Sequence, residues 1–168
     1  MCIRDSLEEE INIDLSRVYA CGYSNGSFFS YGLACHLSDK IAAIGSVAGT
    51  MMDGTYDGCE ASTPTGMINI HGTGDSVVPY NGTTGLKAID DVLDYWSNLN
   101  QATELEISEN SGFHQYEYKD TDGDVYVRHF KIINGGHDWN DKIKYGGKSS
   151  SQLIWEFVSR FDISGLIE

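Results

Sequence analysis

The apolar positions of the chain form two kinds of pattern, which predict strands and helices in alternation. Continuous apolar, β-prone runs predict three buried strands, at 17–22, 41–49 and 65–72. Apolar residues at helical spacing predict three helices, one starting directly after Ser24, one spanning 85–99, and one after the N-cap candidates Ser149 to Ser151. This βα order predicts a mostly parallel sheet with helices on both faces.

The segment 116–133, YEYKDTDGDVYVRHFKII, breaks this alternation. Two β-rich runs flank DTDGD, in which the Asp-Gly pair predicts the turn of a β-hairpin. A calcium-binding loop is the alternative, but such a loop needs Gly at its sixth position and Glu at its twelfth. Counted from Asp120, Gly123 is fourth and Lys131 is twelfth, so the sequence favours the hairpin.

Length, composition and charge restrict the class of protein. The 168 residues fit a single domain, and the 40% hydrophobic content predicts a globular fold. The formal net charge of −14 repels phosphate backbones and anionic lipid, so neither nucleic acid nor a membrane is expected as a partner. An uncharged ester or polymer suits this charge better, although simple solubility explains the acidity equally well.

The cysteines do not have metal-binding spacing. Cys2, Cys21, Cys35 and Cys59 form no C-x-x-C pair and have no paired histidines, so no zinc site is expected. Cys21 lies inside a predicted strand and is interpreted as a buried thiol. Cys35 and Cys59 are the candidate pair for a disulfide in an oxidising compartment.

The pentapeptide GYSNG places Ser24 between a predicted strand and a predicted helix. A serine on such a sharp turn is the nucleophile of many hydrolases, where small residues two before and two after relieve crowding of the backbone. Gly22 and Gly26 occupy those two positions. Ser24 is therefore the candidate nucleophile, and it needs a histidine base and an acid that orients the base.

Suitable partners follow Ser24 in the order acid then histidine. Asp75 lies in the loop after the third predicted strand, and His137 lies in the loop after the hairpin. Both positions suit a site at the carboxyl ends of parallel strands. Structural roles are expected for the other histidines, which are His36, His71, His114 and His129.

Three segments together resemble the polyhydroxybutyrate depolymerase and feruloyl esterase group of α/β-hydrolases, over roughly residues 11–161. They are INIDLSRVYACGYSNGSFFSYGLACHLSDKIAAIGSVAGTM, HGTGDSVVPYNG and GGHDW. The resemblance implies a partial α/β-hydrolase fold with a β-hairpin insertion before the catalytic histidine. It also implies that Ser24 is the nucleophile, Asp75 the acid and His137 the general base.

Supporting roles follow from the same resemblance. The backbone N–H of Asn25 is expected to donate to the oxyanion, while Tyr23 and Trp139 are expected in the substrate cleft. Ordinary packing is an equal alternative for Trp139. Neither a metal nor an organic cofactor is implied.

The resemblance also implies strands and an oxyanion loop upstream of Ser24, and residues 1–23 do not supply them. We interpret the chain as the C-terminal part of a truncated domain, with 1–6 as a non-native start before the tail of a helix at 7–10. The first strand, including Val18 and Ala20, is then expected at an exposed edge of the sheet. The full-length protein is expected to be secreted or periplasmic.

The leading hypothesis is a serine esterase that acts on a polyhydroxyalkanoate or on plant-wall esters, as feruloyl and acetylxylan esterases do. One alternative is a non-catalytic fragment that binds a polymer or partner. The other is an acyltransferase or serine peptidase that uses the same three residues.

Overall fold

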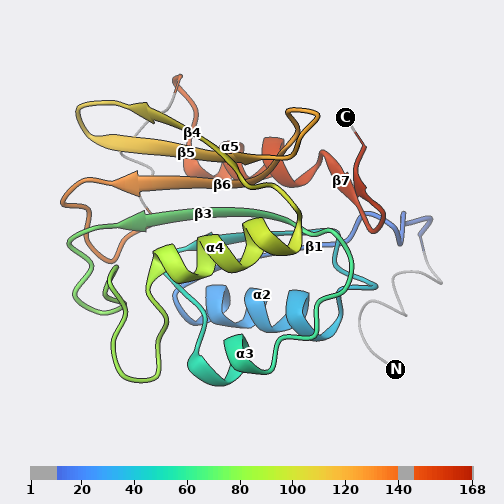
Figure 1. Cartoon of the computed structure of the whole chain (residues 1–168), viewed down its shortest axis with the longest axis horizontal. Helices are drawn as coiled ribbons and strands as arrows, with labels where there is room; N and C mark the ends of the chain where they lie inside the picture. Colours follow the sequence, from blue (N-terminus) through green and yellow to red (C-terminus); the bar gives the residue numbers. More distant parts are fainter. Residues whose placement is uncertain (1–10, 140–145, 168) are drawn as a thin grey trace.

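The centre of the protein is a six-stranded sheet with the strand order β1-β2-β3-β6-β5-β4 (Figure 1). The structure is a computed structural model that describes residues 11–139 and 146–167. The strands are β1 (Tyr19–Tyr23), β2 (Ala43–Val47), β3 (Gly66–Gly72), β4 (Glu104–Glu109), β5 (Phe113–Lys119) and β6 (Val125–Ile132). β1, β2, β3 and β6 run parallel, whereas β5 and β4 are antiparallel additions. A mostly parallel sheet is thus confirmed.

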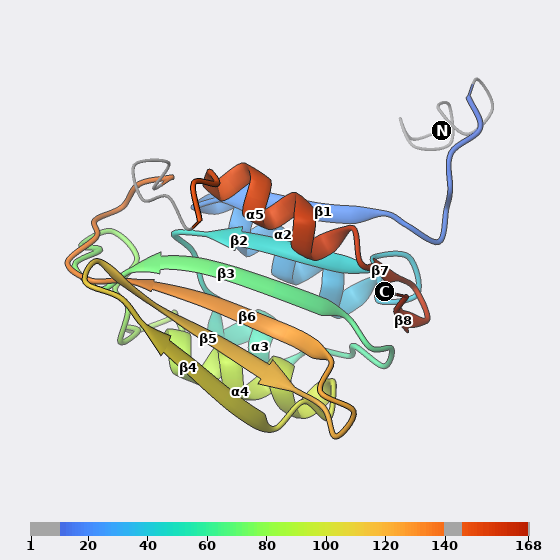
Figure 2. The same cartoon turned by 90° about the horizontal axis from the view of Figure 1, so that it is seen from above.

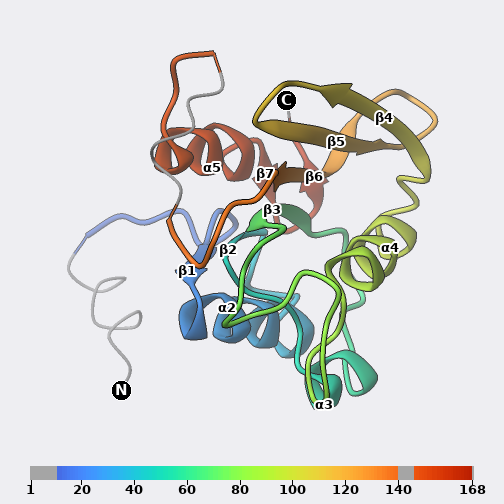
Figure 3. The ribbon, with the colours of Figure 1, turned by 90° about the vertical axis from the view of Figure 1, so that its left-hand side faces the viewer.

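Helices cover both faces of the sheet. The helices are α2 (Asn25–His36), α3 (Asp53–Asp57), α4 (Ile89–Leu99) and α5 (Ser150–Val158), and α5 leads into the small β7 (Phe161–Asp162) and β8 (Gly165–Leu166) pair. Figures 2 and 3 show α5 on one face and α2 and α4 on the other, with α3 beside α2. Within the described ranges, no helix has the length and apolarity needed to cross a membrane.

The two faces contain separate hydrophobic cores. Ile44 and Met67 pack with Trp96 of α4 and the buried side of α2. Ile68 packs on the opposite face with Phe157 of α5. β2 and β3 are buried at every position, because each lies between two neighbouring strands and beneath helices on both faces. Their continuous apolar sequences predicted this correctly.

β1 is different, because it forms the edge of the sheet. Within the described chain it pairs with β2 only, and its residues are half-buried or exposed. The expectation that 17–22 is buried on both faces is therefore wrong. The interpretation of Cys21 as a buried thiol is also wrong, since Cys21 is exposed. Val18 and Ala20 are half-buried, as expected for an edge strand. An apolar run does not by itself specify whether strands lie on both of its sides.

The hairpin prediction is confirmed. β5 and β6 are antiparallel neighbours, and the turn between them contains Gly123 with φ +87°. The carboxylate of Asp120 accepts hydrogen bonds from the amides of Asp122 (3.0 Å) and Asp124 (2.9 Å), which closes the turn. However, β6 also pairs in parallel with β3. The hairpin is therefore part of the central sheet rather than an insertion beside it.

Helix boundaries differ from the sequence prediction at two places. α4 begins at Ile89 rather than at 85, because the amides of Leu86 and Lys87 bond to the carbonyls of Thr83 and Met51 instead of continuing a helix. α3 lies between the second and third predicted strands, where the sequence predicts no helix, since its five residues are too few to show a helical period. α5 begins as predicted after Ser149, whose hydroxyl accepts from the Gln152 amide in a capping box.

A disulfide joins Cys35, near the end of α2, to Cys59, just after α3. The two Cα atoms are 4.7 Å apart, so the predicted pairing is confirmed. Cross-linking these segments limits the freedom of the unfolded chain.

Replacing Cys35 and Cys59 together with alanine is expected to lower the free energy of unfolding by about 3 kcal/mol, because the bond closes a loop with a sequence separation of 24. The corresponding fall in Tm is about 6–12 °C. Thermal unfolding followed by circular dichroism without reductant measures it. The exposed Cys21→Ser variant is the control and should melt like the wild type. A double variant that also melts like the wild type would contradict the prediction.

Candidate active site

Ser24 occupies a strained turn between β1 and α2. Its backbone has φ 53° and ψ −115°, in the region that side chains with a Cβ rarely adopt. The Ser24 amide donates to the carbonyl of Val47 at 2.9 Å, which fixes the turn to β2. A Cβ at position 22 would lie 2.1 Å from the carbonyl carbon of Gly26, so only glycine fits there. A Cβ at Gly26 would meet no neighbouring atom, so position 26, unlike position 22, has room for a side chain.

The structure brings Ser24, His137 and Asp75 into one hydrogen-bonded chain. Ser24 Oγ lies 3.0 Å from His137 Nε2, and His137 Nδ1 lies 2.8 Å from Asp75 Oδ2. The residues follow the ends of β1, β6 and β3, which meet at one edge because these strands are parallel. Because a carboxylate only accepts, His137 Nδ1 carries a proton and Nε2 is free to accept the proton of Ser24.

The loops that hold the acid and the histidine are bonded to each other. The Gly74 amide donates to the Gly135 carbonyl at 2.9 Å, and the Asn134 amide donates to Thr73 Oγ1 at 2.8 Å. The backbones approach so closely that a Cβ at Gly72 would lie 2.1 Å from the Gly135 oxygen. This packing fixes the distance between the two loops, and with it the distance between the imidazole and the carboxylate.

The carboxylate of Asp75 is fully buried, whereas the side chain of His137 is 17% exposed. Burial alone would raise the pKa of Asp75. Hydrogen bonds from the Val78 amide and from His137 outweigh burial, so the pKa of this carboxyl is lowered. Asp75 is therefore ionised at neutral pH and attracts a proton at His137.

Asn25 is the first residue of α2. Its N–H is one of the helix amides that have no acceptor within the helix, and it lies at the positive end of the helix dipole. The first turn of α2 contains no acidic residue. The site next to Ser24 thus suits a developing negative charge, while the oxyanion role of Asn25 stays a prediction.

Tyr23 and Trp139, the two residues expected in the substrate cleft, both lie near His137. The Tyr23 hydroxyl donates to the His137 carbonyl at 3.0 Å, and their ring centroids are 5.0 Å apart. Trp139 lies 6.4 Å from the Tyr23 ring, and its Nε1 donates to Ser151 Oγ at 3.3 Å. Tyr23 therefore supports the loop that carries His137, and the cleft role of both residues stays a prediction.

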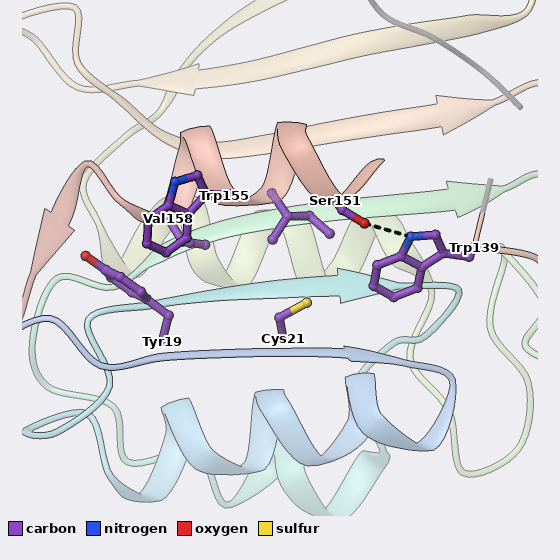
Figure 4. Close-up of a pocket in the computed structure, with 7 residues that line it drawn as sticks. Tyr19, Cys21, Trp139, Ser151, Trp155 and Val158 are labelled. Carbon is purple, nitrogen blue, oxygen red and sulfur yellow. Dashed lines mark hydrogen bonds between the residues drawn. The ribbon is translucent and has the colours of Figure 1, made fainter. Parts of the chain in front are cut away.

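Trp139 also forms one end of an apolar groove between β1 and α5 (Figure 4). The groove has a volume of about 380 Å³. Its lining residues are Tyr19, Cys21, Trp139, Ser151, Ile154, Trp155 and Val158. Trp155 is 61% exposed, so large apolar surface is uncovered on this face of the described structure.

His71 and His129, for which the sequence predicted structural roles, are both fully buried, and His71 lies beside Asp75. His71 Nε2 lies 2.8 Å from the Val78 carbonyl oxygen and 3.5 Å from Asp75 Oδ2. His129 Nε2 lies 3.0 Å from the Tyr80 hydroxyl. The spacing of four between the histidine and the acid in HGTGD is the sequence signal that could have placed His71 beside Asp75.

Burial, with a smaller contribution from the neighbouring His71, lowers the pKa of His129 to about 3, from 6.5 for an unperturbed histidine. As the pH falls, the unfolded chain therefore binds a proton at His129 at a higher pH than the folded chain does. The neutral histidine stabilises the fold fully above pH 6.5, and this contribution is lost as the pH falls towards 3. We expect the free energy of unfolding to fall by about 1.4 kcal/mol per pH unit for this group below pH 6.

Urea unfolding at several values between pH 5 and 7.5 measures this slope. His129→Gln should unfold with a shallower pH dependence than the wild type, while the exposed His36→Gln should keep the full slope. Equal slopes for wild type and His129→Gln would refute the assignment. Asp75 contributes in the same direction only below its unfolded pKa of 3.8, outside the measured range.

The remaining histidines lie away from Ser24. His36 is the last residue of α2, at the opposite end from Ser24, and His114 lies on β5 with Nδ1 3.9 Å from Glu109. Across residues 11–139 and 146–167, no group of three or more His, Cys, Asp or Glu side chains is arranged to hold a metal ion.

Comparison with known proteins gives related sequences over most of the chain. A bifunctional acetylxylan esterase/xylanase, XynS20E, of Neocallimastix patriciarum is 31% identical over 97% of this chain. Feruloyl esterase B of Piromyces equi is 30% identical over 90% of the chain, and a probable feruloyl esterase C of Aspergillus terreus is 29% identical over 94%. No protein-family model matches the chain.

The chain corresponds to only part of each relative. It spans 23% of the Neocallimastix protein, 28% of the Piromyces protein and 55% of the Aspergillus protein. A solved structure of a thermostable esterase superposes with a TM-score of 0.57 over 95% of this chain and 35% of the other, at 15% identity. The fold is therefore α/β-hydrolase-like, and the sequence is similar over most of its length to feruloyl and acetylxylan esterases.

Proposed function

We propose that this chain carries the catalytic site of a serine carboxylic ester hydrolase. The observation that supports it most is the hydrogen-bonded series Ser24, His137 and Asp75, with the serine on a strained strand-to-helix turn. Each distance lies within the range that proton transfer requires. The names of the relatives, which include feruloyl and acetylxylan esterases, point to the same chemistry.

The proposed reaction begins with attack of Ser24 Oγ on the ester carbonyl carbon, while the hydroxyl proton passes to His137 Nε2. Asp75 stabilises the imidazolium that results. The carbonyl oxygen becomes an oxyanion beside the N–H of Asn25. The tetrahedral intermediate then expels the alcohol, which takes the proton from His137 and leaves the acyl group on Ser24.

Water completes the cycle. His137 Nε2 accepts a proton from the water as its oxygen attacks the acyl carbon, and a second tetrahedral intermediate forms. Its collapse returns the proton to Ser24 Oγ and releases the carboxylic acid. No residue is consumed, and each proton that His137 accepts is donated again within the same half-reaction.

Plant-wall esters are the proposed substrates, namely phenolic-acid or acetyl esters of polysaccharide. The relatives named for these substrates favour them over polyhydroxyalkanoates. The net charge of −14 also favours an uncharged polymer over an anionic one. The disulfide between Cys35 and Cys59 supports export, because such bonds persist in oxidising compartments.

A substrate panel tests this proposal. We expect the chain to hydrolyse methyl ferulate and acetylated xylan, with little release from a chromogenic peptide and less acyl transfer to added alcohols than hydrolysis. Peptide cleavage or transfer that exceeds ester hydrolysis would favour the peptidase or acyltransferase alternative. Absence of both hydrolysis and fluorophosphonate labelling would favour a binding fragment.

A further inference from the structure

His71 occupies the next-to-last position of β3 and is fully buried next to the acid. Its Nε2 lies 2.8 Å from the Val78 carbonyl oxygen. A carbonyl oxygen only accepts hydrogen bonds, so Nε2 carries the proton and donates it. The same nitrogen lies 3.5 Å from Asp75 Oδ2, the oxygen that accepts from His137.

Asp75 and the Nε2–H of His71 both form hydrogen bonds to the turn that follows Asp75. Asp75 Oδ1 accepts from the amides of Val77 at 2.9 Å and Val78 at 2.8 Å, so the carboxylate holds the start of the following turn. His71 binds the carbonyl of Val78 and thereby holds the far side of the same residue. The turn from 75 to 78 is thus fixed between the carboxylate and the imidazole.

We propose that His71 is a positioning residue that keeps the Asp75 carboxylate aimed at His137, through its N–H near Oδ2 and its hydrogen bond to Val78. The inference rests on the proposed esterase function, because it assigns a role in the same site. His71 does not touch the reacting atoms. It acts through Asp75.

The environment keeps His71 neutral. Burial lowers the pKa of its imidazole, although the hydrogen bond to Val78 and the charge of Asp75 oppose this. The Tyr80 ring covers His71 edge-on at 5.9 Å. A neutral donor orients the carboxylate without adding a positive charge that would compete with the His137 imidazolium for Asp75.

Two substitutions separate this role from simple packing. In His71→Gln the side-chain amide nitrogen reaches the position of Nε2 and can still donate to the Val78 carbonyl. In His71→Asn the amide is too short to reach it. We expect His71→Asn to lower kcat by about 10²-fold with little change in KM, because misplacement by about 1 Å costs that much. His71→Gln should recover most of the loss.

His129→Asn is the matched control, since His129 is equally buried but pairs with Tyr80 and lies on another strand. It should lose stability without a comparable loss of kcat. The second readout is the downfield proton NMR signal of the His137 Nδ1–H, which requires the bond to Asp75 and no substrate. This signal should weaken or move in His71→Asn and remain in His71→Gln and His129→Asn.

The inference is overturned if folded His71→Asn keeps both the wild-type kcat and the wild-type NMR signal, or if His129→Asn loses as much kcat as His71→Asn. It is also overturned if His71→Gln is as impaired as His71→Asn. Should the wild type show no esterase activity, the proposed function fails, but the NMR comparison still tests whether His71 holds Asp75 on His137.

Discussion

Replacing Ser24 with alanine is expected to lower kcat for ester hydrolysis by about 10⁴- to 10⁶-fold, because the proposed nucleophile is lost while the binding surface stays. KM should change little. Ser24→Gly should lose the same activity but gain about 1 kcal/mol in stability, since glycine adopts the backbone with φ 53° without strain. Hydrolysis of a 4-nitrophenyl ester and urea unfolding measure the two effects.

Fluorophosphonate labelling with mass spectrometry gives a direct control. The adduct should form on the peptide that contains Ser24 and disappear in both variants. Ser76→Ala, a change in the exposed loop beside Asp75, should label normally. A stable adduct on Ser27 or Ser76 would show that the nucleophile has been assigned wrongly. Activity of Ser24→Ala within tenfold of the wild type would reject the serine mechanism itself.

The site geometry could be predicted from the sequence because each of its three side chains lies in a local pattern. Ser24 follows an apolar run and precedes a helical period, so the turn is visible without any long-range contact. Asp75 and His137 follow β-rich runs, and parallel strands place their carboxyl ends at one edge. The chain order of the three residues then leaves few other arrangements.

Features that depend on neighbours in space were less predictable. Cys21 has apolar neighbours in the sequence, yet it is exposed because β1 is the edge of the described sheet. The close contact between Gly72 and Gly135 joins segments that are far apart in the chain, and glycines alone do not indicate such pairing. The parallel pairing of β6 with β3 could not be predicted from the hairpin sequence either, because hairpin signals specify only the antiparallel neighbour, which is β5.

The sequence of β4 has the pattern of a strand, although no strand is predicted there. In ELEISE, Leu105 and Ile107 alternate with polar residues, which is the period of a strand. All its residues are exposed, so the strand is held by its pairing with β5 rather than by burial. Alternation of apolar and polar residues in an exposed segment is a weak signal of a strand, since the sequence of a polar loop often shows the same alternation.

The second large effect is expected for Asp75→Asn, which should lower kcat by about 10⁴-fold. The asparagine oxygen can still accept from the amides of Val77 and Val78, so the turn is retained. Its NH₂ group then faces His137 Nδ1 and donates to it. The ring proton must move to Nε2, which can no longer accept the proton of Ser24.

The same substitution should also reveal the second contact of the carboxylate. The new NH₂ group lies near the His71 N–H, so two donors face each other where a donor and an acceptor met before. We therefore expect a loss of stability of about 1–3 kcal/mol in addition to the loss of kcat. Asp138→Asn, next to His137 in sequence, should keep kcat within about threefold, because the orienting contact comes from Asp75 at 2.8 Å. If Asp138→Asn were the more damaging change, the acid would have to be reassigned.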